Sequence, residues 1–191
     1  KLDSFLLDQA INSGCNLLTT FNVVNVEKSS NIWQITSLDG RQIEAKAVVI
    51  ADGSQSPWPK TFNLGPKKQK FASTFSGRIK RKGNLKSETA RFEFGLVSNG
   101  FAWAFPLNNE VNIGMGTFLD NKNPMPVEEI LKSFLPDLGF DPSEVIGQEA
   151  KLRIWNGHSN LNGDGILLVG DAASLCDPFL AEGLRPALMS G

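Results

Sequence analysis

The chain has 191 residues, of which 41% are hydrophobic and 20% charged, and its formal net charge is -1. This balance is typical of a globular protein and argues against nucleic acid or an anionic membrane as a bulk partner. No run of 18 apolar residues is present, so the sequence predicts no membrane-spanning helix. Two distant cysteines without metal-ligand spacing favour a reducing compartment and predict no metal site.

The first part of the chain reads as one helix followed by strands. Residues 3–14 carry apolar side chains at helical spacing and end on Gly14. Strand-like stretches follow at residues 17–28, 32–37 and 41–46, with a hairpin signal at Asp39 and Gly40. Residues 47–53 are a continuous apolar run that ends on Asp52-Gly53, which is typical of a strand buried on both faces. Because residue 1 leads directly into a helical pattern without an initiator Met, we expect the sequence to be part of a longer chain.

The middle of the chain has a different pattern. Apolar and polar residues alternate from about residue 70 to 120, which predicts an antiparallel sheet with one face on a core. Residues 127–139 predict one short helix that begins after Pro126. Residues 149–160 are expected to return to the first layer, and 165–174 to form a second buried strand before a final helix.

These elements predict an α+β fold, in which an α/β region at the two ends of the sequence is combined with an antiparallel β-sheet in the middle. We expect three segments: residues 1–60 and 159–191 in one domain, and residues 61–158 in an inserted antiparallel-sheet domain.

Asp171 is the first candidate site residue. An acid at the end of a buried strand lies at the edge where open α/β sheets bind ligands, and its carboxylate accepts hydrogen bonds from hydroxyl groups. Gly170 would let a ligand approach the backbone closely. The alternative is that Asp171 caps the next helix. Pro178 fixes a turn, and the helix predicted to begin near Gly183 presents free N–H groups.

The stretch GDAASLCDPFLAEGLRPALMSG resembles the Gly-Asp flavin motif of FAD-dependent reductases and hydroxylases related to p-hydroxybenzoate hydroxylase. The resemblance implies that Asp171 binds the ribityl hydroxyls of FAD, and that the backbone of Gly183 and Leu184 faces the pyrimidine edge of the flavin. Ala181 stands where many members of this superfamily have glycine. A second match, AVVIADGSQSPW, resembles the superfamily's Ala-Asp-Gly motif and implies that Asp52 and Gly53 lie near the cofactor diphosphate.

A third match, FAWAFPLNNEVNIGMG, resembles the signature of the geranylgeranyl reductase family. Alternation predicts that Phe101, Trp103 and Phe105 share one strand face and that Pro106 ends the run. We expect Gly114 and Gly116, on the paired strand, to leave room for a long apolar substrate. The alternative for the aromatic residues is ordinary core packing. Relatives often have Tyr where this chain has Phe101, and the chain contains no Tyr.

The glycine-rich fingerprint G-x-G-x-x-G is not in the sequence. The family carries it near its N-terminus, so the resemblance implies that these residues alone bind FAD weakly or not at all and are inactive.

Three other features leave alternatives open. The basic stretches PKKQKF and GRIKRKGNLK suit a solvated surface, or a patch that binds a dinucleotide phosphate or a protein. His158 is expected on a surface loop. Cys176 is expected to be a small packing residue, with a redox thiol beside the flavin as the alternative.

The resemblance implies a flavoprotein oxidoreductase that reduces C=C bonds of a polyprenyl substrate with reduced FAD, and NADPH or another donor as the reductant. No proton donor or other catalytic residue is identified. The alternatives are a flavin monooxygenase or halogenase on the same scaffold, or a non-catalytic module that binds a lipid or a partner. A cytoplasmic location is expected, with peripheral membrane contact left open, as is the oligomeric state.

Overall fold

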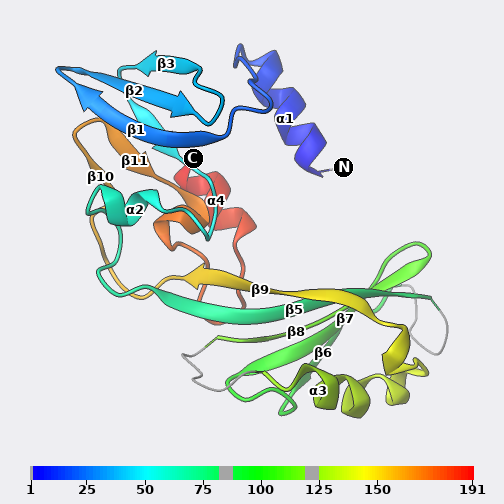
Figure 1. The fold of residues 1–191 in the computed structure, drawn as a ribbon. Coiled ribbons are helices and arrows are strands. Elements are labelled where there is room, and N and C mark those ends of the chain that lie inside the picture. The colour runs from blue at the N-terminus through cyan, green and yellow to red at the C-terminus, as the bar shows by residue number, and fades with distance from the viewer. Residues whose placement is uncertain (1, 82–87, 119–124) are drawn as a thin grey trace. The chain divides into compact units, whose positions relative to one another are not determined.

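The structure is a computed structural model that describes residues 2–81, 88–118 and 125–191. The chain divides into two compact units, Lys1–Val48 and Val49–Gly191 (Figure 1). The predicted α+β class is confirmed, whereas the three-segment assignment to domains stays a prediction. No helix in the described residues is both long and apolar enough to cross a membrane.

The first unit contains helix α1 (Leu2–Asn12) and a three-stranded antiparallel sheet. The sheet has the order β1-β2-β3, with bounds Val23–Ser29, Ile32–Ser37 and Gln42–Ala45. The predicted hairpin is confirmed, because Gly40 adopts a left-handed φ of 84° in the turn between β2 and β3. The predicted strand over residues 17–28 was too long, since β1 begins only at Val23.

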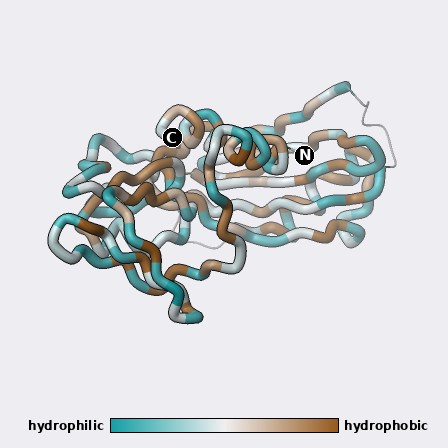
Figure 2. The backbone as a smooth tube through the Cα atoms, turned by 90° about the horizontal axis from the view of Figure 1, so that it is seen from above, coloured by the Kyte–Doolittle hydropathy of each residue, from teal (hydrophilic) through white to brown (hydrophobic). Residues whose placement is uncertain are grey.

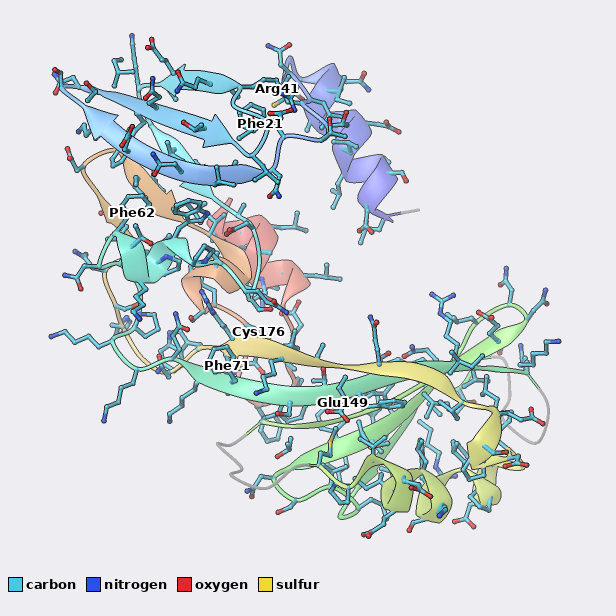
Figure 3. All side chains as sticks on the ribbon, viewed as in Figure 1. Phe21, Arg41, Phe62, Phe71, Glu149 and Cys176 are labelled. Atoms are coloured by element: carbon cyan, nitrogen blue, oxygen red, sulfur yellow. The ribbon has the colours of Figure 1, made fainter. Side chains whose placement is uncertain are left out.

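The loop before β1 has its own support. The guanidinium of Arg41 lies 5.1 Å from the ring centre of Phe21, and its Nη2 donates a 2.7 Å hydrogen bond to the carbonyl of Thr20 (Figure 3). These contacts are local to the first unit and hold the segment out of the ladder.

The second unit begins with a small sheet of order β10-β11-β4. Its strands are β4 (Val48–Ile50), β10 (Asn162–Gly163) and β11 (Ile166–Leu168), and the Val169 N–H donates to the Ile50 carbonyl at 3.0 Å. The expectation that both apolar runs are buried on two faces is wrong for the described residues. Val49 is 59% exposed and Leu167 40% exposed, because the chain covers only one face of these strands.

A five-stranded antiparallel sheet forms most of the second unit, as the alternation predicts. Its order is β6-β7-β8-β5-β9. The bounds are β5 (Lys70–Lys80), β6 (Arg91–Phe94), β7 (Gly100–Pro106), β8 (Glu110–Thr117) and β9 (Ile146–Ile154). Residues 149–154 lie in β9, which pairs with β5 along nine positions, and the end of this strand meets the strand-end layer through a bridge between Ile154 and Cys176.

One face of this sheet carries the core. Helix α3 (Val127–Phe134) follows Pro126 as predicted, and the short helices η1 (Pro136–Leu138) and η2 (Pro142–Glu144) follow it. Together with α3 and η1, inward residues such as Ile113 and Met115 form a cluster of buried side chains. Hydrophobic residues alternate with polar ones along these strands (Figure 2). Three shorter helices complete the unit: α2 (Trp58–Thr61), η3 (Gly170–Ala173) and α4 (Leu184–Ser190).

Candidate functional site

Gly170 and Asp171 follow β11 immediately, as the sequence predicts. Gly170 has a left-handed φ of 55°, and a Cβ there would lie 3.3 Å from the Cβ of Ala187. The Gly170 N–H donates to the Ser190 hydroxyl at 3.0 Å. The group that approaches Gly170 closely is therefore helix α4, and the glycine allows α4 to pack on the strand end.

The Asp171 carboxylate is half-buried and lies against Gly183. Its Oδ1 is 3.4 Å from where a Cβ of Gly183 would stand. Asp171 occupies the first turn of η3, and no side-chain capping bond is present there, so the alternative role as a helix cap is not supported. Within residues 2–81, 88–118 and 125–191, no hydrogen bond reaches this carboxylate from another group. It keeps its acceptor capacity for a ligand.

Burial raises the pKa of Asp171, and the positive charge of Arg153 opposes that shift. Burial also lowers the pKa of Arg153, while Asp52 and Asp171 act in the opposite direction. The two acids that the sequence singles out are thus brought close enough to share one cation. Sequence reasoning missed Arg153, because its alternation with Leu152 and Ile154 is the pattern expected of a solvent-facing residue in a strand.

The loop after β4 is tied to the sheet. Gly53 has a left-handed φ of 85° and its carbonyl accepts from the Ser56 N–H at 3.2 Å, which makes a tight turn. The Ser54 hydroxyl donates to the Lys151 carbonyl at 3.0 Å, and Arg153 Nη2 donates to the Ser56 carbonyl at 2.6 Å. Asp52 therefore stands on a loop that β9 holds at two points.

The acids of residues 177–182 bind their own backbone. Asp177 Oδ1 accepts from the N–H groups of Phe179 and Leu180, at 3.0 and 2.7 Å. These bonds build the turn that contains Pro178. Glu182 Oε1 accepts from the Arg185 N–H at 2.8 Å, so one free donor of α4 is already used. The donors left at the start of α4 are those of Gly183 and Leu184, the two positions that the resemblance implies.

Ala181 has a left-handed φ of 53°. A residue with a Cβ in this conformation carries a cost of about 1–2 kcal/mol that glycine avoids. Alanine at this position therefore adds strain that glycine would avoid. Ala181 also packs against a buried cluster that includes Phe101, Ile154 and Cys176.

The aromatic residues Phe101, Trp103 and Phe105 share one face of β7, as predicted, and this face is opposite to α3. Phe101 and Trp103 have ring centres 5.9 Å apart, and Trp103 stacks on Phe105 at 6.1 Å. Phe92 of the edge strand β6 adds edge-on contacts to Phe101 and Phe105, at 5.8 and 5.2 Å. Phe92 is 49% exposed and Trp103 and Phe105 are partly exposed, so these three rings form an apolar surface on the sheet, whereas Phe101 is only 5% exposed and packs in the core beneath them. Pro106 is the last residue of β7.

Gly114 and Gly116 lie on this same face, but they do not leave empty space as expected. A Cβ at Gly114 would lie 2.1 Å from Cζ2 of Trp103, and one at Gly116 would lie 2.8 Å from Cζ of Phe118. The aromatic rings of this chain fill the room over both glycines. The glycines therefore shape the surface by letting the rings lie flat on the sheet.

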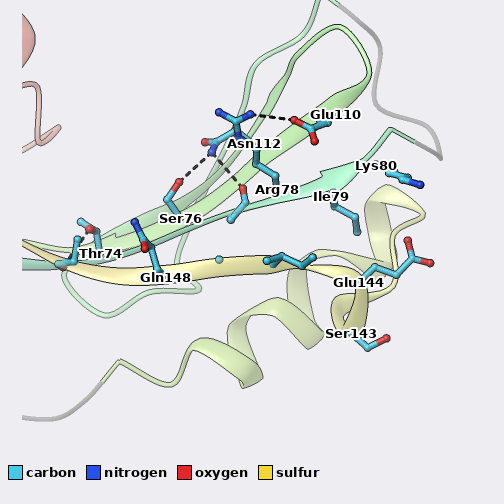
Figure 4. A pocket seen from close by; sticks show the side chains of 14 residues that line it. Thr74, Ser76, Arg78, Ile79, Lys80, Glu110, Asn112, Ser143, Glu144 and Gln148 are labelled. Carbon is cyan, nitrogen blue, oxygen red and sulfur yellow. Dashed lines mark hydrogen bonds and ion pairs between the residues drawn. The ribbon is translucent and has the colours of Figure 1, made fainter. Parts of the chain in front are cut away.

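A polar chain borders the aromatic surface. Trp103 Nε1 donates to Asn112 Oδ1 at 2.9 Å, and Asn112 Nδ2 donates to the Ser76 hydroxyl at 3.0 Å. Figure 4 shows Ser76, Asn112 and Gln148 along a cavity of about 1070 Å³, where Arg78 and Glu110 form an ion pair of 3.1 Å. Asn112 fixes the orientation of the indole, a role that the sequence did not reveal.

Cys176 and His158 match the simpler expectation. Cys176 is 1% exposed, and burial together with nearby Asp171, Asp177 and Glu182 raises the pKa of its thiol to about 12. A thiol of this kind stays protonated at neutral pH and acts as a packing group. His158 is exposed in a loop beside Trp155.

No family model matches the chain. Among curated proteins, the menaquinone reductase of Mycobacterium tuberculosis is 28% identical over all of this chain and 50% of its own length. The digeranylgeranylglycerophospholipid reductase of Methanocaldococcus jannaschii is 24% identical over 99% of this chain and 51% of its own length. The chain thus spans about half the length of these relatives.

Solved structures share the fold. A geranylgeranyl bacteriochlorophyll reductase-like protein of Thermoplasma acidophilum has a TM-score of 0.77 and 20% identity, covering 98% of this chain and 50% of its own. The chain is therefore similar to proteins named as reductases of the geranylgeranyl type, in sequence at below 30% identity and in fold. The halogenase PltM, determined with FAD, aligns with a TM-score of 0.69 and 15% identity over 98% of this chain and 43% of its own. This likeness shows that the fold is shared more widely than one activity.

The packing over Gly114 yields a first prediction. Gly114→Ala should displace the Trp103 indole and lower the free energy of unfolding by about 1–3 kcal/mol, because the added methyl overlaps the ring. Urea unfolding followed by tryptophan fluorescence measures both effects. Gly163→Ala is the control, since a Cβ there meets only Leu64 at 3.6 Å. A Gly114→Ala protein as stable as the parent would show that the indole is not held.

The buried acid yields a second prediction. Burial raises the pKa of Asp171, so the folded state holds this proton more tightly than the unfolded state does. The free energy of unfolding therefore falls as the pH rises from the unfolded-state pKa through the folded-state pKa, where the buried carboxyl becomes charged. Asp171→Asn should therefore raise the melting temperature of the flavin-free protein by about 1–3 °C at pH 7 and leave it nearly unchanged at pH 3. Scanning calorimetry tests this, with Asp137→Asn, at an exposed helix position, as the control. A lower melting temperature at pH 7 would contradict it.

The thiol yields a third prediction. Native labelling with iodoacetamide at pH 8, followed by peptide mass mapping, should modify the exposed Cys15 and leave Cys176 unmodified until the protein is denatured. Rapid native labelling of Cys176 would show an ionised, accessible thiol instead.

Proposed function

We propose that this chain is part of an FAD-dependent oxidoreductase of the geranylgeranyl reductase type, which reduces C=C bonds of a polyprenyl substrate. One observation carries the proposal: the Asp171 carboxylate is half-buried beside Gly183 and accepts no hydrogen bond within the described parts of the chain. A desolvated acceptor with unused capacity suits a ligand that presents several hydroxyl groups. The names of the relatives, which specify reductases, support the reaction class.

The residues fit FAD at one end of the cofactor. Asp171 would accept from the ribityl hydroxyls, and the N–H groups of Gly183 and Leu184 would meet the pyrimidine edge. Asp52 and Gly53 would stand near the diphosphate side. When bound, reduced FAD supplies the hydride. The chain contributes the orientation of the cofactor and a turn at Asp177–Pro178 that is already folded by its own hydrogen bonds.

The aromatic surface fits the second reactant. Trp103 and Phe105 would line the path of an isoprenoid chain, with the buried Phe101 supporting them from the core, and Pro106 would mark its end. Gly114 and Gly116 would contribute by seating the rings rather than by empty space. Such a surface excludes water from an apolar substrate and holds it by dispersion contacts. The chain lacks Tyr, so a phenolic proton donor does not come from these residues. No catalytic residue is assigned.

The electron donor is proposed to be NADPH or another reductant that restores the flavin between turnovers. The protein is proposed to work in the cytoplasm, with contact to a membrane surface where a lipid substrate requires it. The isolated residues 1–191 are proposed to retain flavin poorly and to lack activity.

The full-length protein tests this function. Purified protein should carry a flavin absorbance spectrum, and with dithionite under anaerobic conditions it should add two mass units per reduced double bond to a geranylgeranyl substrate. Asp171→Ala should weaken FAD binding about 10- to 100-fold, because charge-assisted hydrogen bonds are lost. Asp137→Ala, at an exposed position, is the matched control.

Two outcomes would contradict the proposal. Consumption of oxygen with NADPH and no alkene reduction would favour a monooxygenase or halogenase. A colourless protein that added FAD does not reconstitute would favour a non-catalytic binding module.

A further inference from the structure

A cavity of about 840 Å³ lies beside α2 and the loop that follows it, within the second unit. It is distinct in its lining from the surface around Asp171, and it includes part of the basic stretch PKKQKF. Three cationic side chains line it: Lys60, Lys67 and Arg153. Neutral hydrogen-bonding side chains complete the wall, among them Gln55, Asn63 and Gln69, and no carboxylate is among the lining residues.

Arg153 gives this cavity its unusual chemistry. The residue is 6% exposed, and only its Nη2 has a partner, the Ser56 carbonyl at 2.6 Å. Its Nε and Nη1 have no hydrogen-bond partner in the described chain, and neither has the buried hydroxyl of Ser56, which lines the same cavity. Buried donors without partners are rare and costly, at about 1–3 kcal/mol each. Three such groups at one wall therefore call for an acceptor from outside the chain.

The nearby acids do not satisfy this need. Asp52 and Asp171 act on the charge of Arg153 through space, but neither accepts a hydrogen bond from it, and neither lines the cavity. Their charges favour keeping the guanidinium ionised in a buried place. The unpaired Nε and Nη1 donors are therefore those of a positively charged Arg153 side chain.

We propose that this cavity binds the phosphate or diphosphate group of a small molecule. The Nε and Nη1 donors lie on different edges of the guanidinium, and a phosphate or diphosphate group offers several acceptor oxygens to meet them, which a single carbonyl ligand cannot do. Lys60 and Lys67 are exposed and supply further positive charge at the cavity mouth. The group comes from a nucleotide or from a prenyl diphosphate. This site lies outside the residues proposed to hold the flavin, and a prenyl diphosphate as its source rests on the proposed function.

Calorimetric titration of the full-length protein with inorganic pyrophosphate tests the proposal. Binding should be saturable, and Lys60→Met/Lys67→Met should weaken it at least about tenfold, since two charges near the anion are lost. Lys70→Met/Lys151→Met is the control: both lysines are exposed on β5 and β9, outside the cavity, and the change in net charge is the same. Arg153→Lys, which keeps the charge and loses the planar array of guanidinium donors, should weaken binding about tenfold.

Further arms identify the source. ADP that binds at least about tenfold more tightly than pyrophosphate would point to a nucleotide, and geranyl diphosphate that does so would point to a prenyl substrate. Absence of pyrophosphate binding, or equal loss in the cavity and control variants, would overturn the proposal. If Arg153→Lys fails to fold, the lysine variants decide. Flavin absorbance is recorded for each variant and should stay at the parent level for Lys60→Met/Lys67→Met, which separates this site from that of Asp171.

Discussion

The buried guanidinium of Arg153 connects three segments of the second unit. Arg153 enters from strand β9 and meets the loop after β4 through the Ser56 carbonyl, while Asp52 and Asp171 interact with its charge from the ends of β4 and β11. Removing a charge from water costs several kcal/mol unless neighbouring groups compensate, so these three chain segments are constrained to stay near one another. The large antiparallel sheet and the small strand-end layer are joined at this point.

Much of the arrangement could be read from local patterns. The start of α3 after Pro126, helix α4, the antiparallel middle and the shared face of Phe101, Trp103 and Phe105 follow from spacing and from Pro and Gly positions. The helix predicted over residues 127–139 was too long, because α3 ends at Phe134 and Pro136 begins the separate helix η1. The motif matches single out Asp52, Asp171 and Gly183 from the sequence alone. These features are determined by residues close together in sequence, or by period-two alternation.

Long-range pairing could not be read in the same way. The pairing of β9 with β5 joins residues about 76 positions apart in sequence. The local sequence of residues 146–154 does not indicate which strand they pair with. Arg153 was missed because its partners come from distant segments. The space over Gly114 was misjudged for a related reason: a glycine in a sequence shows that room is needed, but not whether a ligand or a neighbouring side chain will occupy it.

The turn around Pro178 is held by hydrogen bonds within residues 177–185, and this lowers the entropy cost of binding a molecule against it. Because the carboxylates of Asp177 and Glu182 accept hydrogen bonds from backbone N–H groups of their own segment, the turn is folded without a ligand. A preformed turn loses little conformational entropy when something docks against it. The carboxylates that give the stretch its acidic character thus act as internal scaffolding, and Asp171 is left as the acid available to an incoming molecule.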